Sequence, residues 1–293
     1  MKASLPMTAG ELAMHVLRQQ ARAFAEHAPE ARTSTDTEHV HQTRVATRRM
    51  RAALRVFGDV LPDELIGLSD ELKWIAEQLG PVRDLDVQHR RVEDTGAALG
   101  VSQALLPYGA WLEEARQRAL ASLIDAFQSE RFLALMDRLE RLEQIQPKAE
   151  ADQPVLEDAP ARMKKAFRRL RKVGDELDVN SEAAEFHKAR IRAKRLRYTV
   201  EFFVPIYGKP AERLVKNTTA LQDLLGDHQD GVVSAQLIQE AVRTSAETWP
   251  PETMMALGRV VQWEAHHGEE LRREFRPTYR EVRDAWRRLR ESL

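Results

Sequence analysis

Apolar residues recur along most of the chain at intervals of three and four positions, the spacing that places them on one face of an α-helix. Prolines and glycines interrupt this pattern and set the expected helix ends. The pattern predicts an all-α protein. Helices are expected in the first half near residues 8–28, 36–60, 63–79, 82–96, 102–128 and 130–145. In the second half they are expected near residues 157–173, 181–204, 209–225, 228–246, 251–273 and 278–291.

The two halves of the chain resemble each other. The stretch from Gln146 to Pro154 is polar and holds two prolines, which is typical of a linker. At an offset of 146 residues His41 aligns with His187, and Leu79-Gly80 aligns with Leu225-Gly226. The match predicts a duplication. The expected units are an N-terminal helical bundle over 1–146 and a C-terminal helical bundle over 155–293.

Composition limits the classes of function. The 293 residues include no cysteine, which excludes disulfides, thiolate metal sites and cysteine nucleophiles. No apolar run approaches the roughly 18 residues of a membrane span, and the first 20 residues lack the apolar core of a signal peptide. We expect a soluble cytoplasmic protein with no membrane partner.

The net charge of −1 hides a strong segregation of charge. Three segments contain no acidic residue, namely 39–57, 162–172 and 187–200, and together they hold 18 of the 45 basic residues. The rest of the chain therefore carries an excess of 19 acidic residues over basic ones. This distribution predicts a basic face that binds a polyanion, beside an acidic remainder.

Two of the acid-free segments form basic stripes on their predicted helices. At about 100° per residue one stripe falls on a single face, over roughly 21 Å, and its members are His41, Arg44, Arg48, Arg51 and Arg55. The second stripe holds His187, Arg190, Lys194 and Arg197, with Tyr198 nearby and Glu201 in the place of Arg55. Like charges at these spacings repel one another, and a chain of phosphates would relieve the repulsion.

Several neighbouring residues have two possible roles. Each stripe begins with a histidine, which either donates to phosphate or is satisfied by a neighbouring group. In the segment from Arg162, Lys164 and Arg168 are expected to reach the ligand. The acids that follow the two Leu-Gly pairs are Asp84, Asp86 and Asp230. They are expected to cap helices, or alternatively to orient side chains of the stripes.

The paired motifs resemble the two halves of a CHAD domain, the conserved histidine α-helical domain. The first runs from His41 through Arg44, Arg48, Arg49 and Arg51 to Leu79-Gly80-Pro81-Val82-Arg83-Asp84-Leu85-Asp86. The second runs from His187 through Arg190, Lys194, Arg195, Arg197 and Tyr198 to Leu225-Gly226 and Asp230. The resemblance covers nearly the whole chain, 1–293, as a single domain. It implies two helical bundles related by pseudo-two-fold symmetry and, for some members, association with polyphosphate granules.

The resemblance also implies a ligand, inorganic polyphosphate, and no cofactor. The candidate contacts are His41, Arg44, Arg48, Arg49, Arg51, Arg55, Lys164, Arg168, His187, Arg190, Lys194, Arg195, Arg197 and Tyr198. Some members carry a triphosphatase module with an ExExK motif. That motif is absent from this sequence, so the expectation is binding without catalysis.

Two other functions remain open from the sequence. Nucleic-acid binding would use the same cations, although only Tyr198 offers an aromatic ring for base stacking. A metal-dependent phosphohydrolase would need ligands such as His228 with Asp230, or His266 with His267, but neither pair has companions at a persuasive spacing. The oligomeric state is not predicted, nor whether the halves form one channel or two grooves.

Overall fold

The computed structural model describes residues 8–32, 37–148, 154–245 and 247–293, and over these residues the protein is all-α, as predicted. The helices of the first half are α1 (Ala9–His27), α2 (Thr37–Val56), α3 (Leu68–Leu99), α4 (Leu106–Gln128) and α5 (Glu130–Arg141). Those of the second half are α6 (Val155–Gly174), α7 (Ala183–Glu201), the short α8 (Val204–Tyr207), α9 (Lys209–Ser245) and α10 (Pro251–Arg290). Short 3-10 turns cover Glu30–Arg32, Asp63–Leu65 and Ser102–Leu105.

Three expected helix breaks are wrong. The chain runs without interruption through Gly80-Pro81 in α3, through Gly226 in α9 and through Pro277 in α10. A proline inside a helix removes one backbone hydrogen bond and normally kinks or ends the helix. Here tertiary packing outweighs that local cost, because Leu79 and Val82 on either side of Gly80-Pro81 are fully buried.

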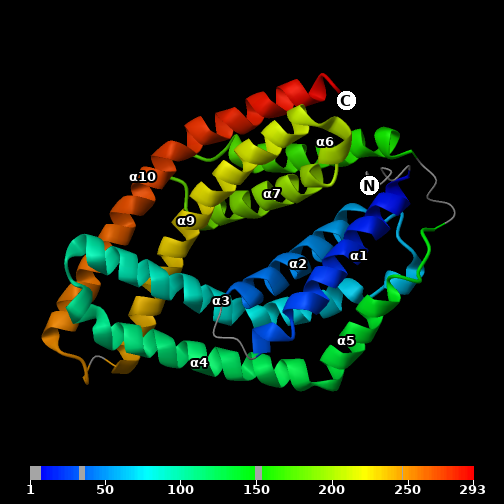
Figure 1. The fold of residues 1–293 in the computed structure, drawn as a ribbon. Coiled ribbons are helices and arrows are strands. Elements are labelled where there is room, and N and C mark those ends of the chain that lie inside the picture. The colour runs from blue at the N-terminus through cyan, green and yellow to red at the C-terminus, as the bar shows by residue number, and fades with distance from the viewer. Residues whose placement is uncertain (1–7, 33–36, 149–153, 246) are drawn as a thin grey trace.

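The long helices place the two basic helices opposite each other. In the first half α2 packs between α1 and α3, and in the second half α7 packs between α6 and α9. Figure 1 shows α2 and α7 side by side across the middle of the molecule, and the two helices are in direct contact. The halves therefore present their stripes to a common region.

Two apolar cores hold this arrangement. The larger core runs through both halves, and in it Phe57 packs against Phe203, its counterpart at the 146-residue offset, with ring centroids 5.8 Å apart. The smaller core lies where the α3–α4 hairpin meets the α9–α10 hairpin, around the fully buried Tyr108 and Val260. The two halves are thus joined on both sides of the stripes.

Local predictions at the element ends have mixed outcomes. Thr8 and Glu11 form a capping box at the start of α1, the pattern that their spacing in the sequence predicts. Thr35 and Glu38 have the same spacing, but Thr35 lies outside the described residues. In the expected linker, residues 146–148 are not helical, and residues 149–153 lie outside the described part of the chain.

Candidate functional site

The two stripes meet in one cluster of cations between α2 and α7. We call it the central cluster and define it as His41, Arg44, Arg48, Arg190, Lys194 and Arg197. The side chain of Arg48 lies within electrostatic range of Arg190 and Arg197 on the opposite helix, and Lys194 lies within range of Arg44 and Arg48. Cations from the two halves therefore form a single site.

The central cluster is buried enough to disfavour its own charge. Burial, followed by repulsion from Arg190, Arg48 and Arg44, lowers the pKa of Lys194 from 10.5 to about 7. Burial is also the largest effect on Arg48, whose pKa is lowered. Burial and repulsion thus both disfavour charge here, and an anion placed between the helices would offset them.

Several arginines of the stripes hold buried donors without acceptors. The Nε atoms of Arg48, Arg51 and Arg190 are buried and have no hydrogen-bond partner in the described residues. Buried polar groups in folded proteins are nearly always paired, and an unpaired one needs an explanation. Oxygen atoms of a bound anion would supply the missing acceptors.

Glycines at corresponding places face two of these arginines, and at Gly80 the approach is close. A Cβ at Gly80 of α3 would lie 2.9 Å from a terminal nitrogen of Arg44, and one at Gly226 of α9 would lie 4.0 Å from the Nε of Arg190. The Leu-Gly pairs, which the sequence predicts to end helices, instead lie inside them, and Gly80 makes room for Arg44.

Acidic residues partly neutralise the central cluster. Asp84 forms an ion pair with Arg44 at 3.1 Å, and Asp86 pairs with Arg116 at 2.7 Å. Asp230 lies near Arg190, and burial raises its pKa. All three acids lie inside helices, so the capping role is wrong, whereas the alternative role of orienting a stripe residue fits Asp84.

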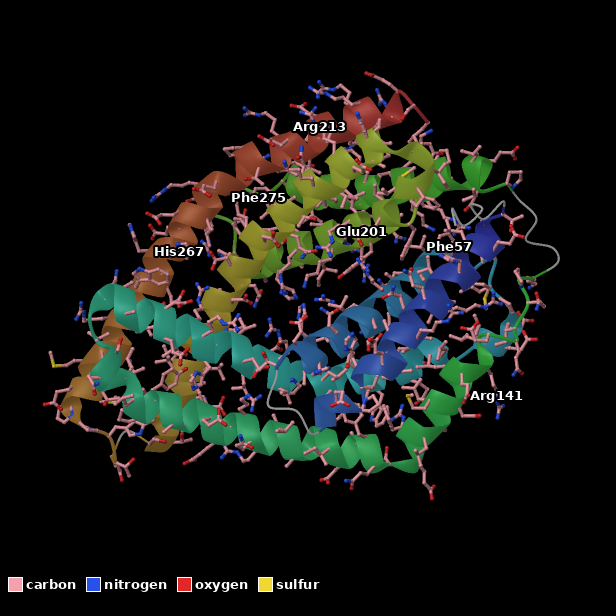
Figure 2. The ribbon with its side chains drawn as sticks, viewed as in Figure 1. Phe57, Arg141, Glu201, Arg213, His267 and Phe275 are labelled. Carbon is pink, nitrogen blue, oxygen red and sulfur yellow. The ribbon has the colours of Figure 1, made fainter. Side chains whose placement is uncertain are left out.

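Glu201 closes one end of the second stripe. Its carboxylate lies 2.9 Å from the Nε of Arg197 and 3.6 Å from Arg49, so it links α7 to α2. Figure 2 shows Glu201 at this position, on the side of α7 that faces α2. Glu201, which stands where the first stripe has Arg55, therefore partly neutralises Arg197 and Arg49, two of the expected contacts.

The two histidines that begin the stripes lie in different environments. Burial, and after it the positive charge of Arg83, lowers the pKa of His41 below its usual value. The Nδ1 of His187 lies 2.7 Å from the amide oxygen of Gln229 and donates to it, since that oxygen can only accept.

A second group of cations continues the basic surface where α2, α6 and α7 meet. We call this the α6 pocket, and it is lined by Ala52, Arg55, Val56, Arg162, Lys165, Ala166, Arg169, Arg192, Arg195 and Thr199. Burial and then neighbouring cations lower the pKa of Arg55 and that of Arg195. Arg162 is held by Asp59 and Asp158, so its role is structural.

Some of the expected contact residues lie in the two parts of the site, and others lie outside them. The central cluster and the α6 pocket together contain His41, Arg44, Arg48, Arg55, Arg190, Lys194, Arg195 and Arg197. Arg51 lies between them, near Arg55. Tyr198 is only 6% exposed, and its ring lies beside the central cluster, 4.9 Å from the guanidinium carbon of Arg197 and within electrostatic range of Arg48.

Lys164 and Arg168 line neither part of the site, and Lys165 and Arg169 line the α6 pocket instead. At the 146-residue offset between the halves, Lys164 corresponds to Arg18 and Arg168 to Arg22. Those two arginines have structural partners, the carbonyl oxygen of Leu142 and the Glu143 carboxylate. The other cations that the sequence reading missed are Arg83 and Arg192.

The candidate metal ligands are engaged elsewhere. The buried His228 accepts a hydrogen bond from Arg272, and burial lowers its pKa to about 4. His267 pairs with Asp227 at 2.7 Å. In the described part of the chain, no group of three or more His, Cys, Asp or Glu side chains is arranged to hold a metal ion. Nor does any helix of that part have the length and apolar character needed to cross a membrane.

Comparison with known proteins adds sequence and structural relatives. The family model described as CHAD domain matches residues 15–239. Two curated Mycobacterium tuberculosis proteins, the uncharacterized proteins Rv2226 and MT2285, are each 32% identical over 267 residues. The match covers 86% of this chain and 49% of each relative, so the chain spans about half the length of these curated relatives.

Two solved structures share the fold. The CHAD domain from the plant Ricinus communis superposes with a TM-score of 0.75 at 25% identity, covering 95% of this chain and 93% of that one. PptA from Streptomyces chartreusis gives a TM-score of 0.75 at 22% identity, covering 94% of this chain and 100% of that one. The second likeness concerns the fold alone.

Proposed function

Because the chain belongs to the CHAD domain family, we propose that it binds inorganic polyphosphate in the central cluster and does not turn it over. The observation that carries the proposal is the set of buried Nε donors that lack acceptors in the described residues, those of Arg48 and Arg190 in the central cluster and that of Arg51 next to it. A row of guanidinium groups matches an extended chain of phosphates, each of which offers charged acceptor oxygens. Granules of polyphosphate in the cytoplasm are the location that we propose for this binding.

Duplex nucleic acid fits the site less well. Packed helices lie about 8–10 Å apart, and α2 and α7 are in contact, so the groups buried between them suit a thin flexible chain. The aromatic ring that base stacking would need is the largely buried Tyr198. Competition at equal phosphate concentration separates the two ligands, and polyphosphate is expected to displace DNA.

Polyphosphate binding is expected to weaken steeply with salt. With about five cations at the site, the logarithm of the association constant should fall against the logarithm of the salt concentration with a slope of roughly −4. Arg48→Gln should reduce the steepness of this slope by about one. Titrations between about 50 and 200 mM salt measure it. Arg141→Gln, which removes an exposed charge paired with Asp137 on α5, is the control and should leave the slope unchanged.

Binding is also expected to take up protons at Lys194. With a pKa of about 7 in the free protein, this amine is roughly half charged at pH 7 and mostly neutral at pH 9. Bound phosphate favours the charged form and raises the pKa, so affinity should fall between pH 7 and 9, by at most about 50-fold. Calorimetry in buffers of different ionisation heat counts the protons taken up.

Lys194→Arg is the matched variant for this experiment, because an arginine keeps its charge throughout this range. It should bind with little proton uptake above pH 7. The polyphosphate used should be long, so that proton uptake by its few terminal phosphates stays small beside that of Lys194. Equal proton uptake by the variant and the unmodified protein would assign the titration to another group and contradict the prediction.

A further inference from the structure

A third row of arginines runs along the C-terminal part of α10, away from the central cluster. We call it the outer stripe, and its members are Arg276, Arg280, Arg283, Arg287 and Arg290. At about 100° per residue the five lie within an arc of about 80°, over a length of about 21 Å. All five are exposed, and Figure 2 shows nitrogen-tipped side chains projecting from the outer side of this part of α10.

Cations of α6 accompany the outer stripe. The helices run antiparallel, because Phe167 stacks on Trp286 with centroids 4.5 Å apart, while Arg276 donates to the backbone oxygen of Asp175 at 3.1 Å. A surface pocket at their junction is lined by Phe167, Arg171, Trp286 and three arginines of the outer stripe. Lys164 and Arg168 are also exposed on α6.

Acidic partners are too few to neutralise this surface. Asp175 pairs with Arg283 at 3.3 Å, and Asp284 pairs with Arg287 at 3.2 Å. Within the described residues, Arg171, Arg280 and Arg290 have no acidic partner within 4.0 Å. Rows of like charge on a helix are unfavourable by themselves, so an unpaired excess of this size suits a polyanionic ligand.

The outer stripe is separate from the site already described. On α6, Lys165 and Arg169 line the pocket shared with α2 and α7, whereas Arg171 lines the pocket shared with α10. Between these two faces the fully buried Leu170 and the stacked Phe167 and Trp286 fill the interior. A phosphate chain seated between α2 and α7 would therefore leave the outer stripe free.

We propose that the outer stripe, with Arg171, Lys164 and Arg168, is a second polyphosphate-binding surface through which one protein molecule bridges two segments of polyphosphate. The proposal rests on the proposed function of the central cluster. Because the outer stripe is exposed, its contacts are weaker than those of the buried cluster and more sensitive to salt.

The test is a titration with polyphosphate of about 20 Å extended length, roughly that of one stripe. The unmodified chain should show one tight and one weak binding event. The triple variant Arg283→Gln, Arg287→Gln, Arg290→Gln should lose the weak event and keep the tight one. The control Lys73→Gln, Arg118→Gln, Arg141→Gln removes the same charge from exposed pairs on α3, α4 and α5 and should keep both.

Light scattering with long polyphosphate tests the bridging itself. Scattering should rise at intermediate mixing ratios for the unmodified chain and for the control, and it should stay low for the outer variant. Equal stoichiometry and scattering for all three proteins would overturn the inference. A weak event that appears with duplex DNA but not with polyphosphate would also overturn it. Loss of the tight event in the outer variant would instead contradict the proposed function, because that event belongs to the central cluster.

Discussion

The double substitution Arg48→Met and Lys194→Met is expected to weaken polyphosphate binding by about 100-fold or more while it stabilises the free protein. A charge-assisted hydrogen bond contributes roughly 1.5–3 kcal/mol, so the loss of two removes at least two powers of ten in affinity. Calorimetric or fluorescence titration at fixed salt measures this loss.

The gain in stability follows from the free protein itself. The burial and mutual repulsion that lower the pKa of both side chains oppose folding, and no group in the described part of the chain accepts from the Nε of Arg48. Methionine keeps an unbranched apolar chain of similar reach and leaves no new buried polar group. Relief of such strain at functional sites commonly contributes about 0.5–2 kcal/mol, which thermal and denaturant unfolding would detect.

Opposite changes in binding and stability distinguish a binding site from a structural one. If the variant binds as well as the unmodified protein, the central cluster is not the site. If it loses binding and also unfolds more easily, the two cations hold the fold together and the proposal loses its main support. Arg118→Met with Arg141→Met removes two charges from exposed ion pairs and serves as the matched control.

The stripes of α2 and α7 were predictable because their information is local. The spacing of Arg44, Arg48 and Arg51 fixes one helix face, and the absence of acids from that segment marks the face as unusual. That the two stripes meet was not predictable from the spacing, because it depends on contacts between helices far apart in the sequence. The same limit explains the choice of Lys164 in place of Lys165, since adjacent residues point about 100° apart on a helix.

The outer stripe shows a different limit of sequence reading. Arg280, Arg283 and Arg287 have the same spacing of three and four residues as the α2 stripe, but Glu281 and Asp284 lie between them in the sequence. A search for acid-free segments therefore passes over this row. In the helix, Glu281 falls outside the arc of the arginines. The helix face that carries the arginines is therefore more basic than the linear sequence of this stretch suggests.

A second large effect is expected away from the basic surface, where Glu264→Ala should lower the free energy of unfolding by about 3 kcal/mol or more. Arg91 of α3 donates from Nε and a terminal nitrogen to the two oxygens of Glu264 in α10, at 2.7 and 2.6 Å, and to Asp227 of α9 at 2.6 Å. The Glu264 side chain is 2% exposed and that of Arg91 is 15% exposed.

The size of the effect comes from the charge that the substitution leaves behind. Burial alone would lower the pKa of Arg91, but its hydrogen bonds to Glu264 and Asp227 outweigh burial and raise the pKa. Without Glu264 the guanidinium stays charged and keeps only Asp227. Removal of one partner from a buried pair is strongly destabilising, whereas replacement of both partners by apolar groups is often close to neutral.

A double-mutant cycle tests this account of the contact between the halves. Glu264→Met should show the same loss as Glu264→Ala, and the double variant Arg91→Met, Glu264→Met should recover much of it. Glu93→Ala removes an exposed glutamate of α3 that lies 3.4 Å from His89, and it should change stability by less than about 0.5 kcal/mol. Additive effects of the two single substitutions would contradict the prediction.

Because this ion pair joins α3 to α10 beside the smaller core, its loss should also loosen the region that holds the two stripes face to face. Polyphosphate bound across both stripes should then restore part of the lost stability, since a ligand that binds only the folded state stabilises it in proportion to the logarithm of its concentration above the dissociation constant.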